Sequence, residues 1–185
     1  MYKRQRLLEF INDESCANLK IHLISNGTLF SAKEWAKFPG IHNRVASVRI
    51  SIDAATKETF ERLRLFGIHE ELLANLAFLK ELRANRAFQD LSFSFTYQVD
   101  NFREMKDFVA FGDRMGADYV SFERLQNLTF TPEAFRAKAV HLPDHPLHAE
   151  FLDIVRDPVF ASKRVLSDFE FGGAAHQGLR LSDLA

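Results

Sequence analysis

The chain has 185 residues, enough for one domain with a sizeable hydrophobic core. Its 24 basic and 25 acidic residues nearly balance, so charge gives no reason to expect nucleic acid or an anionic membrane surface as a partner. The single cysteine, Cys16, excludes an intrachain disulfide framework, and no apolar run is long enough to cross a bilayer, so we expect a cytoplasmic protein.

The chain opens with a helical pattern and then a strand. Residues 4–11 carry apolar side chains at helical spacing and predict a short helix. Residues 19–25 alternate as a strand and stop at Asn26-Gly27, a pair suited to a sharp turn. Ser31 can then cap a brief helix that ends before Pro39.

Residues 47–53 have the clearest strand pattern. Their odd positions are polar and their even positions β-branched, which indicates two faces with different surroundings. If this is a central strand, helices cover one of its faces, and Ser51 and Asp53 on the other face point toward a polar lumen. A solvated edge strand explains these seven residues equally well.

Two helices are expected after the central strand. Thr56 is placed to cap the first, which ends near Gly67. Residues 70–83 keep the i, i+3, i+4 rhythm of a helix that lies on a sheet.

Two more strands follow, with a helix between them. Residues 91–98 alternate aromatic and polar side chains, and residues 118–125 form the last predicted strand. Asn101 can cap the intervening helix, which closes at Gly116.

The alternation of strands and helices predicts an α/β fold with a parallel sheet. In such sheets ligands bind beyond the carboxyl ends of the strands. The polar residues at those ends are Ser25 with Asn26, Ser51 with Asp53, Gln98 with Asn101, and Glu123. Polar ends on four strands favour a binding site in the lumen over scattered surface polarity.

Five segments together resemble the middle and later strands of radical S-adenosylmethionine (SAM) enzymes. They are ISNGT at 24–28, RISIDAAT at 49–56, ETFERLR at 58–64, QVDNFREM at 98–105 and GADYVSF at 116–122. The later segments resemble the subgroup that often carries a SPASM-type auxiliary-cluster extension. The resemblance covers residues 19–148.

The resemblance implies an incomplete parallel (β/α) barrel, TIM-barrel-like, over residues 1–141, which lacks the first two strands and is followed by a tail at 142–185. A complete family member holds a [4Fe-4S] cluster and SAM, and cleaves SAM to a 5′-deoxyadenosyl radical that abstracts hydrogen from its substrate. For this chain the substrate is unknown; a peptide and a small molecule both remain open.

The resemblance also implies residue roles. Ser51 would contact the ribose of SAM, Arg64 the methionine carboxylate, and Leu125 would lie near the adenine. The same cavity would be lined by Asn26, Asp53 and Gln98. A guanidinium beside a polar lumen suits a carboxylate, although without the resemblance a solvated helix charge is the simpler interpretation of Arg64.

The chain departs from the family where the cluster binds. The CxxxCxxC loop and the GGEP segment have no counterpart, because the chain begins in what resembles the helix before the third strand. We expect Cys16 to be an ordinary thiol, with no metal ligand and no catalytic residue in this chain. The polypeptide alone is therefore expected neither to assemble a cluster nor to cleave SAM.

Three hypotheses follow. The favoured one is a fragment, or one part of a split reading frame, of a radical SAM enzyme. The alternatives are a non-catalytic half-barrel that binds a small molecule or a protein partner, and an unrelated α/β binding module. We also expect self-association through the free edge of the first strand.

A histidine-rich stretch offers one further candidate site. His141, His145 and His148 could bind zinc together with Glu150, but a proline-broken loop seldom holds tetrahedral geometry. We expect surface histidines.

Overall fold

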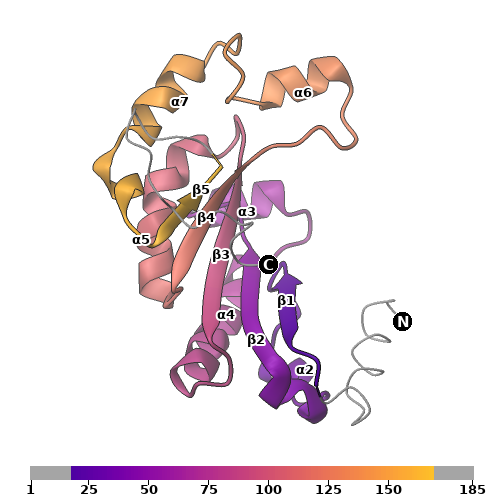
Figure 1. Ribbon diagram of the computed structural model, residues 1–185. Helices are drawn as coiled ribbons and strands as arrows, with labels where there is room; N and C mark the ends of the chain where they lie inside the picture. The colour runs from indigo at the N-terminus through magenta and orange to yellow at the C-terminus, as the bar shows by residue number, and fades with distance from the viewer. Residues whose placement is uncertain (1–17, 169–185) are drawn as a thin grey trace.

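The computed structural model describes residues 18–168 and shows one parallel sheet. Each strand pairs with the next along the chain, and the sheet does not close within the described residues (Figure 1). The strands are β1 Ile21–Ser25, β2 Val45–Ser51, β3 Asp90–Tyr97, β4 Tyr119–Arg124 and β5 Val165–Ser167. The predicted order and direction of the first four are confirmed, whereas β5 was not predicted.

Helices cover one face of this sheet and cap its carboxyl edge. In Figure 1, α3, α4 and α5 lie on one side of the strands, and α6 and α7 lie beyond their carboxyl ends. The helices are α2 Ala32–Trp35, α3 Lys57–Leu63, α4 His69–Ala84, α5 Met105–Met115, α6 Pro132–Lys138 and α7 His148–Val155, with short 3₁₀ turns η2 Pro39–Arg44, η3 Phe102–Glu104 and η4 Pro158–Ala161.

Two predicted caps are confirmed and one is wrong. The Oγ of Ser31 accepts from the backbone N–H of Glu34, and that of Thr56 from Thr59, each at 3.3 Å. The side chain of Asn101 makes no such bond to η3. Its oxygen accepts instead from the backbone N–H of Gln98, 2.8 Å away, because that donor would otherwise lack a partner at the end of β3.

The hydrophobic core lies between the sheet and the helices. Val48 and Ile50 of β2 are fully buried on the helix side. Phe95 packs against Phe108 of α5, with ring centroids 4.8 Å apart, and against Phe122 of β4 at 5.5 Å. Since β2 pairs with both β1 and β3, the interpretation of residues 47–53 as an edge strand is wrong.

Several expectations lie outside the described residues or stay predictions. The helix at 4–11 and Cys16 fall outside the described range. An open parallel α/β sheet is what the described residues form, and its interpretation as an incomplete barrel stays a prediction. So does the boundary after residue 141, although β5, which follows it, joins the same sheet. No described helix is long and apolar enough to span a membrane.

Candidate functional site

The carboxyl end of β2 turns sharply and is tied to β3. Asp53 has a φ of 66°, a left-handed conformation uncommon for residues other than glycine. Its Oδ1 accepts from the backbone N–H of Thr96, 2.7 Å away. Asn101 donates to the backbone oxygen of Asp53 at 2.9 Å and to that of Thr96 at 3.0 Å. These bonds hold the turn in a conformation that its own residues would seldom adopt.

Arg64 reaches this turn from the end of α3. Its Nη2 donates to the backbone oxygen and the Oγ of Ser51, at 3.2 and 3.0 Å, and to the carboxylate of Asp53. We call Ser51, Asp53 and Arg64 the edge cluster. The Arg64 side chain is 30% exposed, so its interpretation as a solvated helix charge is wrong.

Arg64 has hydrogen-bond donors that the edge cluster does not use. Burial raises the pKa of Asp53, while the Arg64 charge and the Thr96 N–H act in the opposite direction. All the hydrogen bonds of Arg64 to described groups come from one nitrogen, Nη2. The other guanidinium N–H groups make no hydrogen bond to a described residue, so within residues 18–168 they are available to a ligand carboxylate.

Glu104 holds the loop that connects β2 to α3. Its carboxylate accepts from the backbone N–H groups of Ala55 and Thr56, at 2.7 and 3.1 Å, and from the Thr56 hydroxyl at 2.8 Å. Burial raises the pKa of Glu104, but bonds from Thr59, Ala55 and Thr56 outweigh it and leave the pKa below its usual value. No local sequence pattern indicates this role.

The remaining predicted site residues lie at strand ends, and among the described hydrogen bonds none joins them directly to the edge cluster. Asn26 is exposed, and its Oδ1 closes a local turn by accepting from the backbone and the hydroxyl of Thr28. Gln98 is linked to the cluster only through Asn101, by its backbone N–H. Leu125 follows β4 and is partly exposed.

The histidine stretch shows no metal geometry. Nδ1 of His148 and Nε2 of His145 each bond to a backbone carbonyl, at 3.1 and 3.3 Å. Glu150 is held by Arg103 through two bonds of 2.6 and 2.8 Å. Burial lowers the pKa of His141, whose Nδ1 is buried without a partner. Residues 18–168 contain no cluster of His, Cys, Asp or Glu that could hold a metal ion.

Comparisons with known proteins support the fold. No protein-family model and no curated protein matches the sequence. A solved structure that does match is TYW1 with a lysine-pyruvate adduct bound, with a TM-score of 0.53 and 16% identity. TYW1 is a radical SAM enzyme. The match covers 83% of this chain and 44% of that one, so the chain spans less than half the length of its structural neighbour. At this identity the likeness shows a shared fold, and it carries no information on the SPASM subgroup.

The two cofactors of the radical SAM family fit this chain differently. A [4Fe-4S] cluster needs several thiolates, and the sequence contains one cysteine, so these residues do not fit a cluster. The edge cluster offers guanidinium donors, which suit a carboxylate, and the Ser51 hydroxyl, which suits a sugar hydroxyl, and these are the kinds of group that SAM carries.

Proposed function

We propose that this chain forms the carboxyl-terminal part of a radical SAM barrel and binds SAM at the carboxyl edge of its sheet. The observation that carries the proposal is the meeting of Ser51, Asp53 and Arg64 at the end of β2. Three residues assigned to SAM from the sequence resemblance thus contact one another, at the edge where parallel α/β sheets bind their ligands.

In this proposal each residue has a binding role. The free N–H groups of Arg64 bind the methionine carboxylate, and the Ser51 hydroxyl turns to the ribose. Asp53 keeps its bond to Arg64 and fixes the guanidinium. The cavity is completed by Asn26, Gln98 and, near the adenine, Leu125. When bound in a complete enzyme, SAM supplies the 5′-deoxyadenosyl radical for hydrogen abstraction.

The chain alone is proposed to bind SAM without cleaving it, because it carries a single cysteine. The same observation favours a second candidate function, a non-catalytic half-barrel that binds a small molecule or a protein partner. Fragment status, membership of the SPASM subgroup and a cytoplasmic location remain part of the proposal.

Calorimetric titration with SAM tests the proposal. Losing a hydrogen bond to a charged group costs about 1.5–3 kcal/mol, so Arg64→Ala should weaken SAM binding by about tenfold or more. Ser51→Ala should weaken it less, since its hydroxyl is neutral. Arg136, exposed on α6, provides the matched control Arg136→Ala. SAM affinity that is unchanged in Arg64→Ala would exclude this binding mode.

A further inference from the structure

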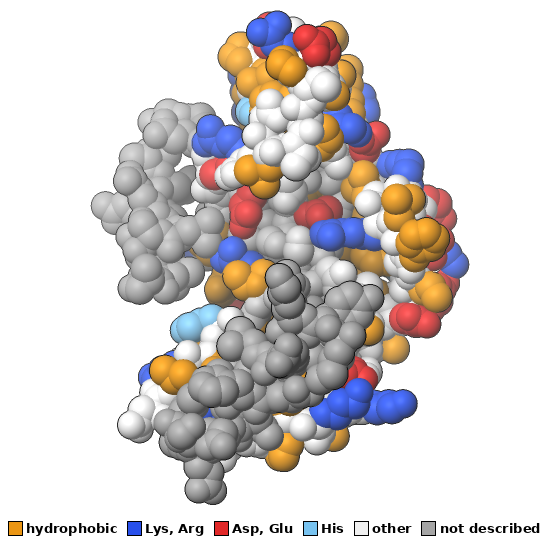
Figure 2. Space-filling view, turned by 90° about the vertical axis from the view of Figure 1, so that its right-hand side faces the viewer, with side chains coloured by type: hydrophobic (Ala, Val, Ile, Leu, Met, Phe, Trp, Pro, Cys, Tyr) orange, Lys and Arg blue, Asp and Glu red, His pale blue; other side chains and the backbone are white. Residues whose placement is uncertain are grey.

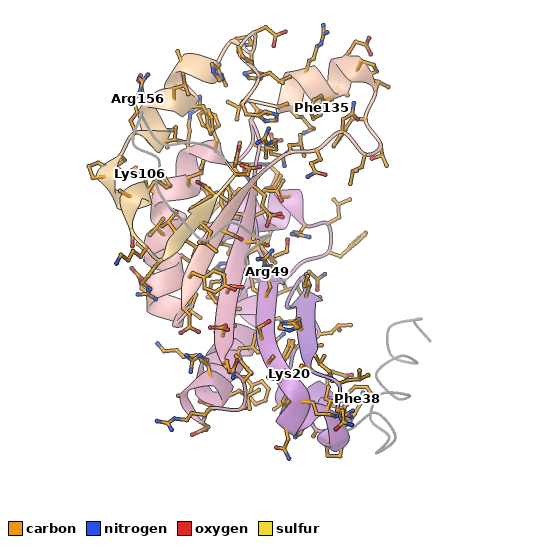
Figure 3. The ribbon with its side chains drawn as sticks, in the orientation of Figure 1. Lys20, Phe38, Arg49, Lys106, Phe135 and Arg156 are labelled. Atoms are coloured by element: carbon orange, nitrogen blue, oxygen red, sulfur yellow. The ribbon has the colours of Figure 1, made fainter. Side chains whose placement is uncertain are left out.

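A second set of polar groups lies on the face of the sheet opposite the helices. Arg49 precedes Ser51 by two residues on β2, so both side chains leave the strand on the same face. The register pairs Ser94 with both Ser51 and Ser121, which places Ser121 and Glu123 of β4 on this face as well. In Figure 3, Arg49 lies toward the carboxyl end of β2.

Arg49 and Glu123 form an ion pair across β3. Both side chains could still form further hydrogen bonds. Nη1 of Arg49 donates to Oε1 of Glu123 at 3.3 Å, and this is the only hydrogen bond of either side chain to a described residue. The two side chains are 19% and 36% exposed. Compared with the bidentate pair of Arg83 and Asp118, at 2.8 and 3.0 Å, this one is long and single. Bonds to a ligand can therefore replace it more easily than they could replace a bidentate pair.

On this face, the hydroxyl of Ser121 lacks a hydrogen-bond partner among residues 18–168. Ser121 is 1% exposed, and its Oγ is buried. A buried hydroxyl without a partner costs about 1–3 kcal/mol. Ser121 lies two residues before Glu123 on the same strand, roughly 6.6 Å away along β4. The unpaired hydroxyl of Ser121 therefore lies beside the Arg49–Glu123 ion pair, whose two groups could each form further hydrogen bonds.

We propose that this face binds the zwitterionic end of an α-amino acid substrate. The substrate carboxylate pairs with Arg49, and its ammonium group pairs with Glu123 and also donates to the Oγ of Ser121. The inference rests on the proposed function, in which SAM lies at the neighbouring edge cluster. It adds that the ligand bound next to SAM is an α-amino acid.

Charge balance favours a zwitterion over other ligands. A simple anion that takes Arg49 leaves Glu123 partly buried without a counter-charge, and a simple cation does the same to Arg49. A zwitterion replaces the Arg49–Glu123 pair by two ion pairs, one between Arg49 and its carboxylate and one between Glu123 and its ammonium group. Every charge then keeps a counter-charge. Figure 2, which views the molecule from the side of β1, shows acidic and basic side chains next to each other across the middle of the described surface.

Titration with three related probes, followed by ¹H–¹⁵N NMR, tests the inference. L-alanine carries both charges, N-acetyl-L-alanine lacks the ammonium group, and L-alaninamide lacks the carboxylate. L-alanine should bind saturably, and each blocked analogue should bind about tenfold more weakly. Equal binding of the three probes would overturn the inference.

Variants locate the site. Arg49→Gln and Glu123→Gln should each weaken L-alanine binding by about tenfold, whereas Arg103→Gln, which opens an exposed ion pair with Glu150, should leave it unchanged. Ser121→Ala should weaken binding while stabilising the free protein, since it removes an unsatisfied hydroxyl. A purely structural serine would not give that combination.

Parallel SAM titrations separate the two proposals. L-alanine binding that is lost in Arg64→Ala and kept in Arg49→Gln would place the amino acid at the edge cluster and overturn this inference. SAM binding without L-alanine binding would overturn it and leave the proposed function standing. L-alanine binding by the Arg49 site without SAM binding would support the amino acid site and contradict the proposed function.

Discussion

Burial raises the pKa of both Asp53 and Glu104, but the net shifts of the two carboxyl groups have opposite directions. The pKa of Asp53 is raised, mainly by burial, so the stability it contributes is present below its unfolded pKa and is lost as pH rises through the folded value. The pKa of Glu104 is lowered, because bonds from Thr59, Ala55 and Thr56 outweigh its burial. Its contribution is present above the unfolded value and is lost as pH falls through the folded one. Acidification should therefore release the loop that Glu104 holds.

Glu104→Gln tests this at the level of one residue. The amide keeps the shape of the side chain but loses the charge that strengthens its bonds, so the free energy of unfolding at neutral pH should fall by about 1–3 kcal/mol. As pH falls through the folded pKa of Glu104, which lies below the usual glutamate value, the difference between variant and wild type should disappear. Urea denaturation at neutral and acid pH measures both effects. Glu81→Gln, at an exposed position of α4, serves as the control. A constant difference at all pH values would contradict the assignment.

Sequence reasoning found the residues of the site that are close to one another along the chain. Ser51, Asp53 and Arg64 follow from the end of a strand and the helix after it. The strand-end pattern includes Asn101 but not its bond to Asp53, 48 residues away, and it does not include Glu104, whose partners after β2 lie 48 and 49 residues away. No local pattern distinguishes a carboxylate that holds a distant loop from a solvated one.

At the level of elements, hydrophobic alternation was sufficient for the long strands and failed for the shortest. β2 and β3 have seven and eight residues and show the period-two pattern clearly. β5 has three, too few for alternation to be recognised, and it forms because β4 offers an edge to which it can bond. Its existence depends on tertiary context.

The packing of α5 on β4 requires glycine at one position. A Cβ at Gly112 would collide with Cγ1 of Val120. Gly112→Ala should therefore lower the free energy of unfolding by roughly 1–3 kcal/mol, although alanine favours a helix more than glycine does. Chemical denaturation measures the loss. Val120→Ala removes the obstructing methyl groups, so the double variant should be no less stable than Val120→Ala alone. An additive loss in the double variant would show that this contact is not the cause.

At the level of the whole molecule, the described sheet is open and helices cover one face. Its first strand, β1, pairs only with β2 among the described strands. Ile24 on this strand is 68% exposed, and Leu29 just after it is 65% exposed. The structural neighbour is more than twice as long as the segment that matches this chain. An edge with unpaired backbone groups and exposed apolar side chains favours pairing with another strand.

In the isolated chain a second copy is the available partner for this edge. We therefore predict concentration-dependent association through β1, with Ile24 covered in the associated form. Ile24→Lys places a charge on the edge strand, which disfavours pairing, and should weaken self-association by about tenfold or more. Leu128→Lys makes the same change at a side chain that is 81% exposed but lies after β4, so it should have little effect. Sedimentation velocity over a range of concentrations measures association in all three proteins. A wild-type chain that stays monomeric throughout would contradict the prediction, as would equal weakening by both variants.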